Sequence, residues 1–210
     1  MWSNFKLFLV SLRNKIVKGK VDLENDHKEL INGVSVSVGK FTYGTQWMSI
    51  LSWTPGVGSV EIGRFCSISY GLKLFLGGNH HYNWVSTFPF GHIYPSTLHC
   101  MPIEEHPITP KGITIGNDVW IGRDVTIMDG VHIPDGVIIA ANSHVVKSPQ
   151  PYSIIGGNPA THIKFRFDDQ VVKELLNLKW WDWENDKIFK HIELLCNEPK
   201  IEQLKEFYHK

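Results

Sequence analysis

The chain has 210 residues, 42% of them hydrophobic, and its 21 basic side chains (Lys and Arg) equal its 21 acidic ones (Asp and Glu). This length and composition suit one folded domain with a sizeable core and exclude an intrinsically disordered chain, while zero net charge excludes an overall field that attracts nucleic acid. The three cysteines are odd in number and far apart, which predicts no disulfide framework and favours a reducing, cytoplasmic location. No stretch of about 20 residues is continuously apolar, so we expect no membrane-spanning helix.

Residues 1–30 are predicted to form an amphipathic helix and a cap ahead of the main domain. Within residues 1–20, five apolar side chains fall on one helical face: Trp2, Phe5, Leu9, Leu12 and Ile16. The same stretch has five basic residues and no acidic ones. Such a helix can lie peripherally on the anionic inner face of a membrane. It can also pack its apolar face on the main domain, which is the interpretation we favour.

Aliphatic residues recur at every sixth position in the second half of the chain: Ile115, Ile121, Ile127, Ile133, Ile139 and Val145. A period of six fits neither an α-helix nor an alternating strand, but it fits a short strand followed by a corner, with the aliphatic side chain pointing inward. Three such units make an 18-residue triangular coil, in which Ile115 stacks on Ile133 about 4.8 Å away. The pattern therefore predicts a parallel β-helix.

The same sixfold register occurs earlier, at Val38, Ile50, Ile62, Ile68 and Leu74, with Cys66 at a second inward position. The distance from Leu74 to Ile115 is not a multiple of six, so the register must be interrupted between them. We expect a catalytic β-helix over residues 31–166 that carries one long projecting loop at residues 79–112.

Residues 167–210 are predicted to be helical. Asp168 and Asp169 are typical N-cap residues, and apolar residues with helical spacing follow them: Val171, Val172, Leu175, Leu176 and Leu178. A second helix is expected from about Asp182 through Leu195, and a third from Pro199. We expect these helices to close one end of the β-helix, because an open end exposes unpaired strand edges.

Several segments resemble hexapeptide-repeat acyltransferases: residues 115–120 (IGNDVW), 121–126 (IGRDVT) and 152–160 (YSIIGGNPA). Residues 77–80 (GGNH), followed by 86–90 (STFPF), are similar to the xenobiotic acetyltransferase branch, which includes chloramphenicol and streptogramin acetyltransferases and enzymes that acetylate surface polysaccharides. The resemblance covers roughly residues 34–185. It implies a left-handed parallel β-helix, a homotrimer, and acetyl-CoA bound between subunits.

His80 matches the catalytic histidine of this branch and lies where the sixfold register ends. A neutral imidazole can accept the proton of an acceptor hydroxyl as that hydroxyl attacks a thioester, and it can then protonate the departing thiolate. His81 is a neighbouring rival. Adjacent side chains in an extended segment point to opposite sides, so only one of the two is expected in the site, and the motif selects His80.

The loop is rich in aromatic residues, which stack well on sugar rings or drug rings. We expect Tyr82 and Trp84 to contact the acceptor, and Phe88 and Phe90 to fasten the loop to the core. Trp120 is at an outward position of its repeat. Lining the acceptor channel and packing at a trimer interface are equally consistent with that position.

A group of small residues offers bare backbone along which the pantetheine arm of CoA can run: Ala140, Ala141, Gly156, Gly157, Asn158 and Pro159. The phosphates of CoA need cations, and Lys147, Lys164 and Arg166 are available in this region. Thr161 stands where many relatives of the family carry a lysine, which leaves Lys164 as the favoured phosphate contact.

The many histidines raise the alternative of a metal site, as in carbonic anhydrases of the γ class, which share the β-helix and bind zinc through three histidines. His132 and His144 are 12 residues apart, which places them on different faces of an 18-residue coil. No His–Cys pair has the short spacing of a structural zinc site. We therefore expect no metal.

The resemblance implies acetyl-CoA-dependent O-acetylation, and the basic amphipathic N-terminus favours a sugar hydroxyl of a surface polysaccharide as the acceptor, since lipid-linked glycans lie at membranes. The alternative within the same fold is acetylation of an antibiotic, either chloramphenicol or a streptogramin, and N-acetylation of an amino sugar is a further possibility. From a different class, the chain could be a non-catalytic scaffold or a metal-dependent hydratase.

Overall fold

The computed structural model describes residues 23–53, 57–90, 95–99 and 111–207. The helix expected over residues 1–20 lies outside these ranges. None of the helices within them is both long enough and apolar enough to cross a bilayer.

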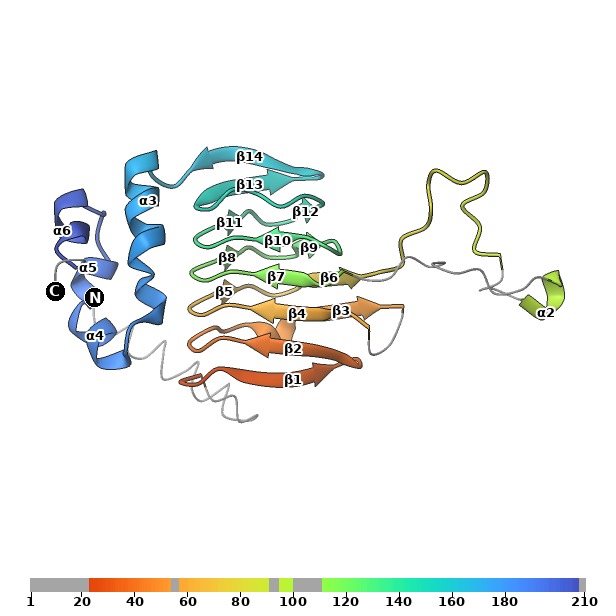
Figure 1. The fold of residues 1–210 in the computed structure, drawn as a ribbon, viewed down its shortest axis with the longest axis horizontal. Helices are drawn as coiled ribbons and strands as arrows, with labels where there is room; N and C mark the ends of the chain where they lie inside the picture. Colours follow the sequence, from red (N-terminus) through yellow and green to blue (C-terminus); the bar gives the residue numbers. More distant parts are fainter. Residues whose placement is uncertain (1–22, 54–56, 91–94, 100–110, 208–210) are drawn as a thin grey trace.

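In the described part of the chain, the strands form three sheets around one apolar core (Figure 1). The first sheet has the order β1(His27–Ile31), β2(Val34–Val38), β4(Ser59–Ile62), β7(Ile113–Ile115), β10(His132–Ile133). The second sheet has the order β14(Ala160–Phe165), β13(Ser153–Gly157), β11(Ile138–Ile139), β8(Trp120–Ile121), β5(Ser67–Ile68). The third sheet has the order β12(His144–Val145), β9(Thr126–Ile127), β6(Lys73–Leu76), β3(Ser49–Ser52).

The register of these sheets confirms the stacking predicted from the sixfold repeat. Ile115 is aligned with Ile133, Ile121 with Ile139, and Ile127 with Val145, always across a parallel pair of strands. All six side chains are at most 1% exposed, and Cys66 is fully buried. Among the described strands, antiparallel pairing occurs only where β1 joins β2 and where β13 joins β14.

The chain reaches each successive sheet through tight corners. At Gly44, φ is +97°, and a Cβ atom there would lie 1.9 Å from the carbonyl oxygen of Ile68. Only glycine allows the backbone to bend this closely against the next coil. The spacing between coils therefore requires a glycine at this corner.

The first coil is longer than the repeat suggests. Ser35 pairs with Ser59 and Ser49 with Lys73, a separation of 24 residues instead of 18. The additional residues lie between β3 and β4, and because they number six they leave the sixfold register intact. Periodicity alone could not reveal this insertion.

The sixfold register stops after β6 and resumes at β7. β6 ends at Leu76 and β7 begins at Ile113, and the described residues between them hold one short helix, α2(Pro95–Leu98). In Figure 1 the chain leaves the sheets at the end of β6 and extends away from them.

The expectation that the C-terminal helices close an end of the stack is wrong. They lie beside it (Figure 1), along a corner between the first and second sheets that we call the helix-side corner (residues 39–41, 63–65, 116–118 and 134–136). The helices are α3(Asp169–Leu178), η2(Trp180–Asp182), α4(Asn185–Lys190), α5(Ile192–Leu195) and α6(Ile201–Lys205). The second predicted helix is thus divided into η2, α4 and α5.

These helices pack against the side of the stack because aromatic side chains project from the helix-side corner. The ring of Phe65 lies 4.7 Å from that of Trp180, and the ring of Phe41 lies 6.3 Å from that of Phe189. Tyr152, 1% exposed, packs with the buried face of α3. The terminal strands of the sheets include β1 and β14, which fold back in antiparallel pairs, so the helices are not used as end caps.

The N-cap predicted for α3 is present, and its contribution to the stability of the protein can be tested. The carboxylate of Asp168 accepts a hydrogen bond from the backbone N–H of Val171 at 2.9 Å. Asp168→Ala is expected to lower the free energy of unfolding by about 1 kcal/mol, because one N–H of the first turn loses its partner. Urea denaturation measures this loss. Asp169→Ala is the matched control, and an equal loss there would contradict the cap.

Candidate active site

His80 lies four residues beyond the end of β6, at the start of the long connection to β7. Its Nδ1 is 2.6 Å from the backbone carbonyl oxygen of Thr87. A carbonyl oxygen can only accept, so Nδ1 carries the proton and donates it to Thr87. The neutral ring therefore has its lone pair on Nε2. This tautomer is the one that a general base needs.

The neighbouring side chains of the loop differ in what they contact. The rings of His81 and Trp84 are stacked, with centroids 4.1 Å apart and planes 7° from parallel. Tyr82 is 90% exposed. His81 is thus engaged with Trp84, while Tyr82 offers an exposed ring that an acceptor can reach.

Phe88 and Phe90 do not fasten the loop to the core, contrary to expectation. Their rings contact each other, with centroids 4.8 Å apart, and both side chains remain more than 40% exposed. The contact at the base of the loop comes instead from Trp53. A Cβ atom on Gly78 would lie 2.8 Å from its ring, which also stacks on Phe75.

Sequence reasoning missed Trp53 because it follows β3, in the inserted connection to β4 that the sixfold period cannot detect. Ser52 pairs with Leu76, so the residue after each strand lies at the same level of the stack. Trp53 is therefore the residue equivalent to Gly77, the first residue after β6, one 24-residue coil earlier. The sequence identifies it only when the length of the first coil is known.

Trp120 points outward from the second sheet, as predicted, and is 56% exposed. Its neighbours across the strands are Ser67 and Ile138, and the same line continues through Ile154 to Lys164. We call this line of outward residues the Trp120 ladder. It is mainly apolar, whereas the outward line Glu61, Thr114, His132 of the first sheet is polar.

The small residues predicted to hold CoA are brought together at the corner between the second and third sheets. Ala140 and Ala141 follow β11, and Gly156 and Gly157 end β13 one coil further along. A Cβ atom on Gly156 would lie 3.0 Å from the Cβ atom of Ala140, so the two backbones approach closely. Asn158 and Pro159 form the turn between β13 and β14. We call this region the Ala140 corner.

Of the three cations considered for the phosphates, Arg166 is engaged elsewhere. Its Nη1 donates to Asp118 at 3.0 Å and to the carbonyl of Gly136 at 2.8 Å, at the helix-side corner. Burial raises the pKa of Asp118, and the neighbouring Arg166 opposes that rise. Lys164 lies on the Trp120 ladder, and Lys147 lies beyond the end of β12.

The predicted residues do not converge within one chain. His80 follows a strand of the third sheet, Trp120 belongs to the second sheet, and the Ala140 corner lies between the second and third sheets. Among the described residues, His132 and His144 are on different sheets, as the spacing predicts, and no three His, Cys, Asp or Glu side chains gather as a metal-binding group.

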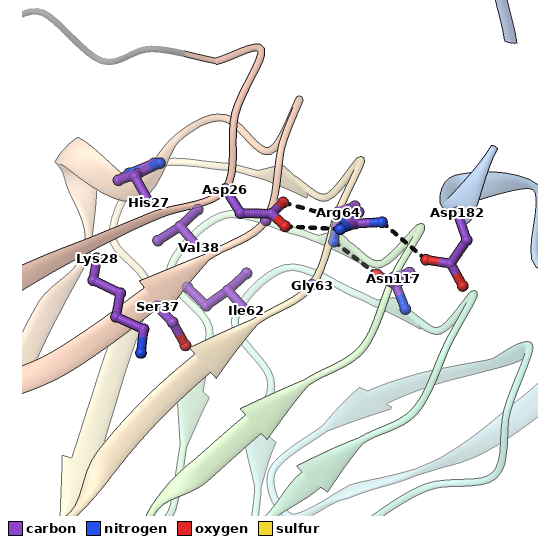
Figure 2. A pocket seen from close by; sticks show the side chains of 11 residues that line it. Asp26, His27, Lys28, Ser37, Val38, Ile62, Gly63, Arg64, Asn117 and Asp182 are labelled. Carbon is purple, nitrogen blue, oxygen red and sulfur yellow. Dashed lines mark hydrogen bonds and ion pairs between the residues drawn. The ribbon is translucent and has the colours of Figure 1, made fainter. Parts of the chain in front are cut away.

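A large hollow of about 520 Å³ contains none of the predicted site residues (Figure 2). It is lined in part by Arg64, which donates to Asp26 at 2.7 Å and to Asp182 at 3.0 Å. The hydrogen bonds from Arg64 hold the pKa of Asp26 below its ordinary value. These charges satisfy one another and join the first sheet to the C-terminal segment, so their role is structural.

Cys66 is not a candidate nucleophile. It is fully buried, its Sγ–H donates to the carbonyl of Gly116 at 3.1 Å, and burial raises the pKa of its thiol to about 12. A thiol in this state is inert at neutral pH.

Comparison with known proteins finds similarity to a bacterial transferase family and to several acetyltransferases. A family model described as "Bacterial transferase hexapeptide (six repeats)" matches residues 112–147. A probable macrolide acetyltransferase of Lysinibacillus sphaericus is 49% identical over 152 residues, covering 71% of this chain and 83% of the relative. A chloramphenicol acetyltransferase of Klebsiella aerogenes is 33% identical over 181 residues, covering 80% and 86%. A virginiamycin A acetyltransferase of Staphylococcus aureus is 47% identical over 146 residues, covering 69% and 65%.

Proposed function

We propose that this chain, which belongs to the xenobiotic acetyltransferase branch of the hexapeptide-repeat acyltransferases, acetylates a hydroxyl group of an antimicrobial compound. It is an acyltransferase, and acetyl-CoA is its donor. The names of its relatives support an antibiotic acceptor, of the macrolide, chloramphenicol or virginiamycin class, over the sugar acceptor favoured from the sequence.

The observation that carries the mechanism is the hydrogen bond from His80 Nδ1 to Thr87. With Nδ1 protonated, His80 Nε2 can accept the proton of the acceptor hydroxyl while the hydroxyl oxygen attacks the acetyl carbon. The thioester supplies an activated acyl group. His80 then returns the proton to the departing sulfur, so that one acetyl ester and one thiol are formed and no acyl-enzyme is required.

The acceptor is proposed to lie against Tyr82, Trp84 and Trp120. Exposed aromatic surface suits large apolar antibiotics, because ring stacking and area burial can both be obtained there. The pantetheine arm is proposed to follow the Ala140 corner, past Ala141, Gly156, Gly157, Asn158 and Pro159, with Lys164 near the diphosphate. The juxtaposition of Ala140 and Gly156 on neighbouring strands supports this path, because it brings the small residues of the two strands to one corner.

The complete site is proposed to form between three copies of the chain, with the coils of residues 31–166 wound left-handed as the family resemblance implies. The Trp120 ladder supports this assembly, because a line of apolar side chains that are only partly covered suits contact with a second copy. A neighbouring subunit would bring its own His80 towards the Trp120 ladder and the Ala140 corner. This arrangement accounts for the separation of these groups within one chain.

An acceptor panel tests the proposed function. Purified protein with acetyl-CoA is expected to acetylate at least one of a macrolide, chloramphenicol and virginiamycin A at a kcat/KM in the ordinary enzymatic range of about 10⁴ M⁻¹s⁻¹ or more. Release of CoA measures the rate, and mass spectrometry identifies the product. Rapid transfer to sugars with all three drugs inert would restore the polysaccharide alternative. Sedimentation of the same preparation is expected to give a trimer.

A further inference from the structure

Two consecutive glycines connect the end of β6 to the segment that carries His80. The φ angles of Gly77 and Gly78 are +70° and +73°, and the chain leaves the stack at this point (Figure 1). Glycine has no Cβ atom, so it populates many backbone conformations besides this one. His80 follows two residues after Gly78, at most about 7 Å further along the chain. The place that His80 occupies relative to the stack therefore depends on what restrains Gly78.

The indole ring of Trp53 supplies a restraint on Gly78. A Cβ atom on Gly78 would lie 2.8 Å from Cε3 of this ring and 3.0 Å from Cδ2. Both distances are shorter than a van der Waals contact between carbon atoms. No side chain fits between the ring and the backbone of residue 78, so the ring covers Gly78 directly and limits the conformations that this glycine can adopt.

The ring of Trp53 is itself held by the third sheet. β3 and β6 are parallel, with Leu51 opposite Phe75, and Trp53 comes two residues after Leu51. The rings of Trp53 and Phe75 are stacked, with centroids 5.8 Å apart and planes 27° from parallel. Trp53 is 55% exposed and is not part of the apolar core. Its position therefore suits a role in holding Gly78 better than a role in core packing.

We propose that Trp53 is a positioning residue for acetyl transfer, which fixes the place of His80 by covering Gly78. The proposal rests on the proposed function, since it assumes that His80 is the general base. The carbonyl of Thr87 orients the imidazole, but it cannot place the ring relative to the stack, because Thr87 and His80 belong to the same connection. Trp53 follows a strand of the stack, so its contact with Gly78 ties the start of that connection to the sheets.

Steady-state kinetics on the full-length protein tests this role. Trp53→Ala is expected to lower kcat by about 10–10²-fold, the cost of misplacing a catalytic group by about 1 Å, and to leave KM for acetyl-CoA and for the acceptor within about threefold. Trp53→Phe keeps a ring that can cover Gly78, and it is expected to restore kcat to within about threefold of the wild type. Phe189→Ala is the matched control and is expected to change no kinetic constant, since Phe189 is 56% exposed and contacts the ring of Phe41 beside the C-terminal helices.

Hydrogen exchange provides a measurement that does not depend on activity. In Trp53→Ala, the amides of residues 77–81 are expected to exchange about tenfold faster than in the wild type, because the segment opens more often without the ring. Trp53→Phe is expected to keep the wild-type exchange, and Phe189→Ala to leave these amides unaffected.

The outcomes separate this proposal from the proposed function. If the wild type transfers acetyl groups and Trp53→Ala keeps the wild-type kcat, Trp53 does not position His80, while the proposed function stands. An increase in the KM for the acceptor at an unchanged kcat would instead make Trp53 an acceptor contact and overturn the positioning role. A kcat that Trp53→Phe fails to restore would also overturn it. If the wild type transfers no acetyl group to any acceptor, the proposed function fails and this proposal fails with it.

Discussion

His80→Ala is expected to lower kcat for acetyl transfer by about 10²–10⁴-fold, the usual contribution of a general base. The physical reason is the tautomer. Nδ1 donates its proton to the carbonyl of Thr87 at 2.6 Å, so the neutral ring carries on Nε2 the lone pair that can take the acceptor proton. The dissociation constant for CoA and the melting temperature are expected to stay close to the wild-type values, because His80 is an exposed loop residue.

His81→Ala is the matched control for His80→Ala. Its ring stacks on Trp84, so its loss should disturb the acceptor position and raise the KM for the acceptor while leaving kcat within about tenfold of the wild type. Steady-state kinetics with the best acceptor from the panel separates the two variants. A kcat that falls more in His81→Ala than in His80→Ala would remove His80 from the role of base.

Arg166→Met is expected to lower the free energy of unfolding by about 2 kcal/mol at pH 7, since a half-buried carboxylate loses its partner. Arg166 joins successive coils of the stack at the helix-side corner. Its Nη1 bonds Asp118 and the carbonyl of Gly136, and its guanidinium lies 5.2 Å from the ring centroid of Tyr152. The side chains of Arg166 and Asp118 are 23% and 28% exposed, so water screens the pair only in part.

The loss caused by Arg166→Met should shrink as the pH falls from 7 towards 5. Burial already raises the pKa of Asp118 above its ordinary value, and Arg166 is the group that opposes this rise. Without Arg166 the folded-state pKa rises further. A carboxyl whose pKa is higher in the folded state than in the unfolded state binds its proton more readily when folded, so its penalty is largest at neutral pH and is relieved by protonation.

Urea denaturation at pH 7 and pH 5 measures this effect. Arg123→Met is the control, because the Arg123–Asp124 pair is largely exposed and is worth at most about 1 kcal/mol. Equal losses in the two variants, or a loss in Arg166→Met that does not change with pH, would show that Asp118 does not depend on Arg166 for its charge.

The core of the fold could be predicted because its determinant is local and repeated. Each inward aliphatic residue, such as Ile121 or Ile139, makes the same contact with the residue one coil away, so spacing alone specifies the register. The N-cap at Asp168 was predictable for a similar reason, since it needs only a carboxylate three residues before a free N–H. The length of the first coil was not, because an insertion of six residues leaves the period unchanged.

The sequence by itself determined the coil register, the position of the long connection and the histidine at its start, since these depend on residues close together in the chain. Only the tertiary structure decided where the C-terminal helices pack, which cation is bound to Asp118, and which side chain covers Gly78. Those outcomes depend on contacts such as Phe65 with Trp180 and Arg166 with Asp118, whose members are 115 and 48 residues apart in the chain.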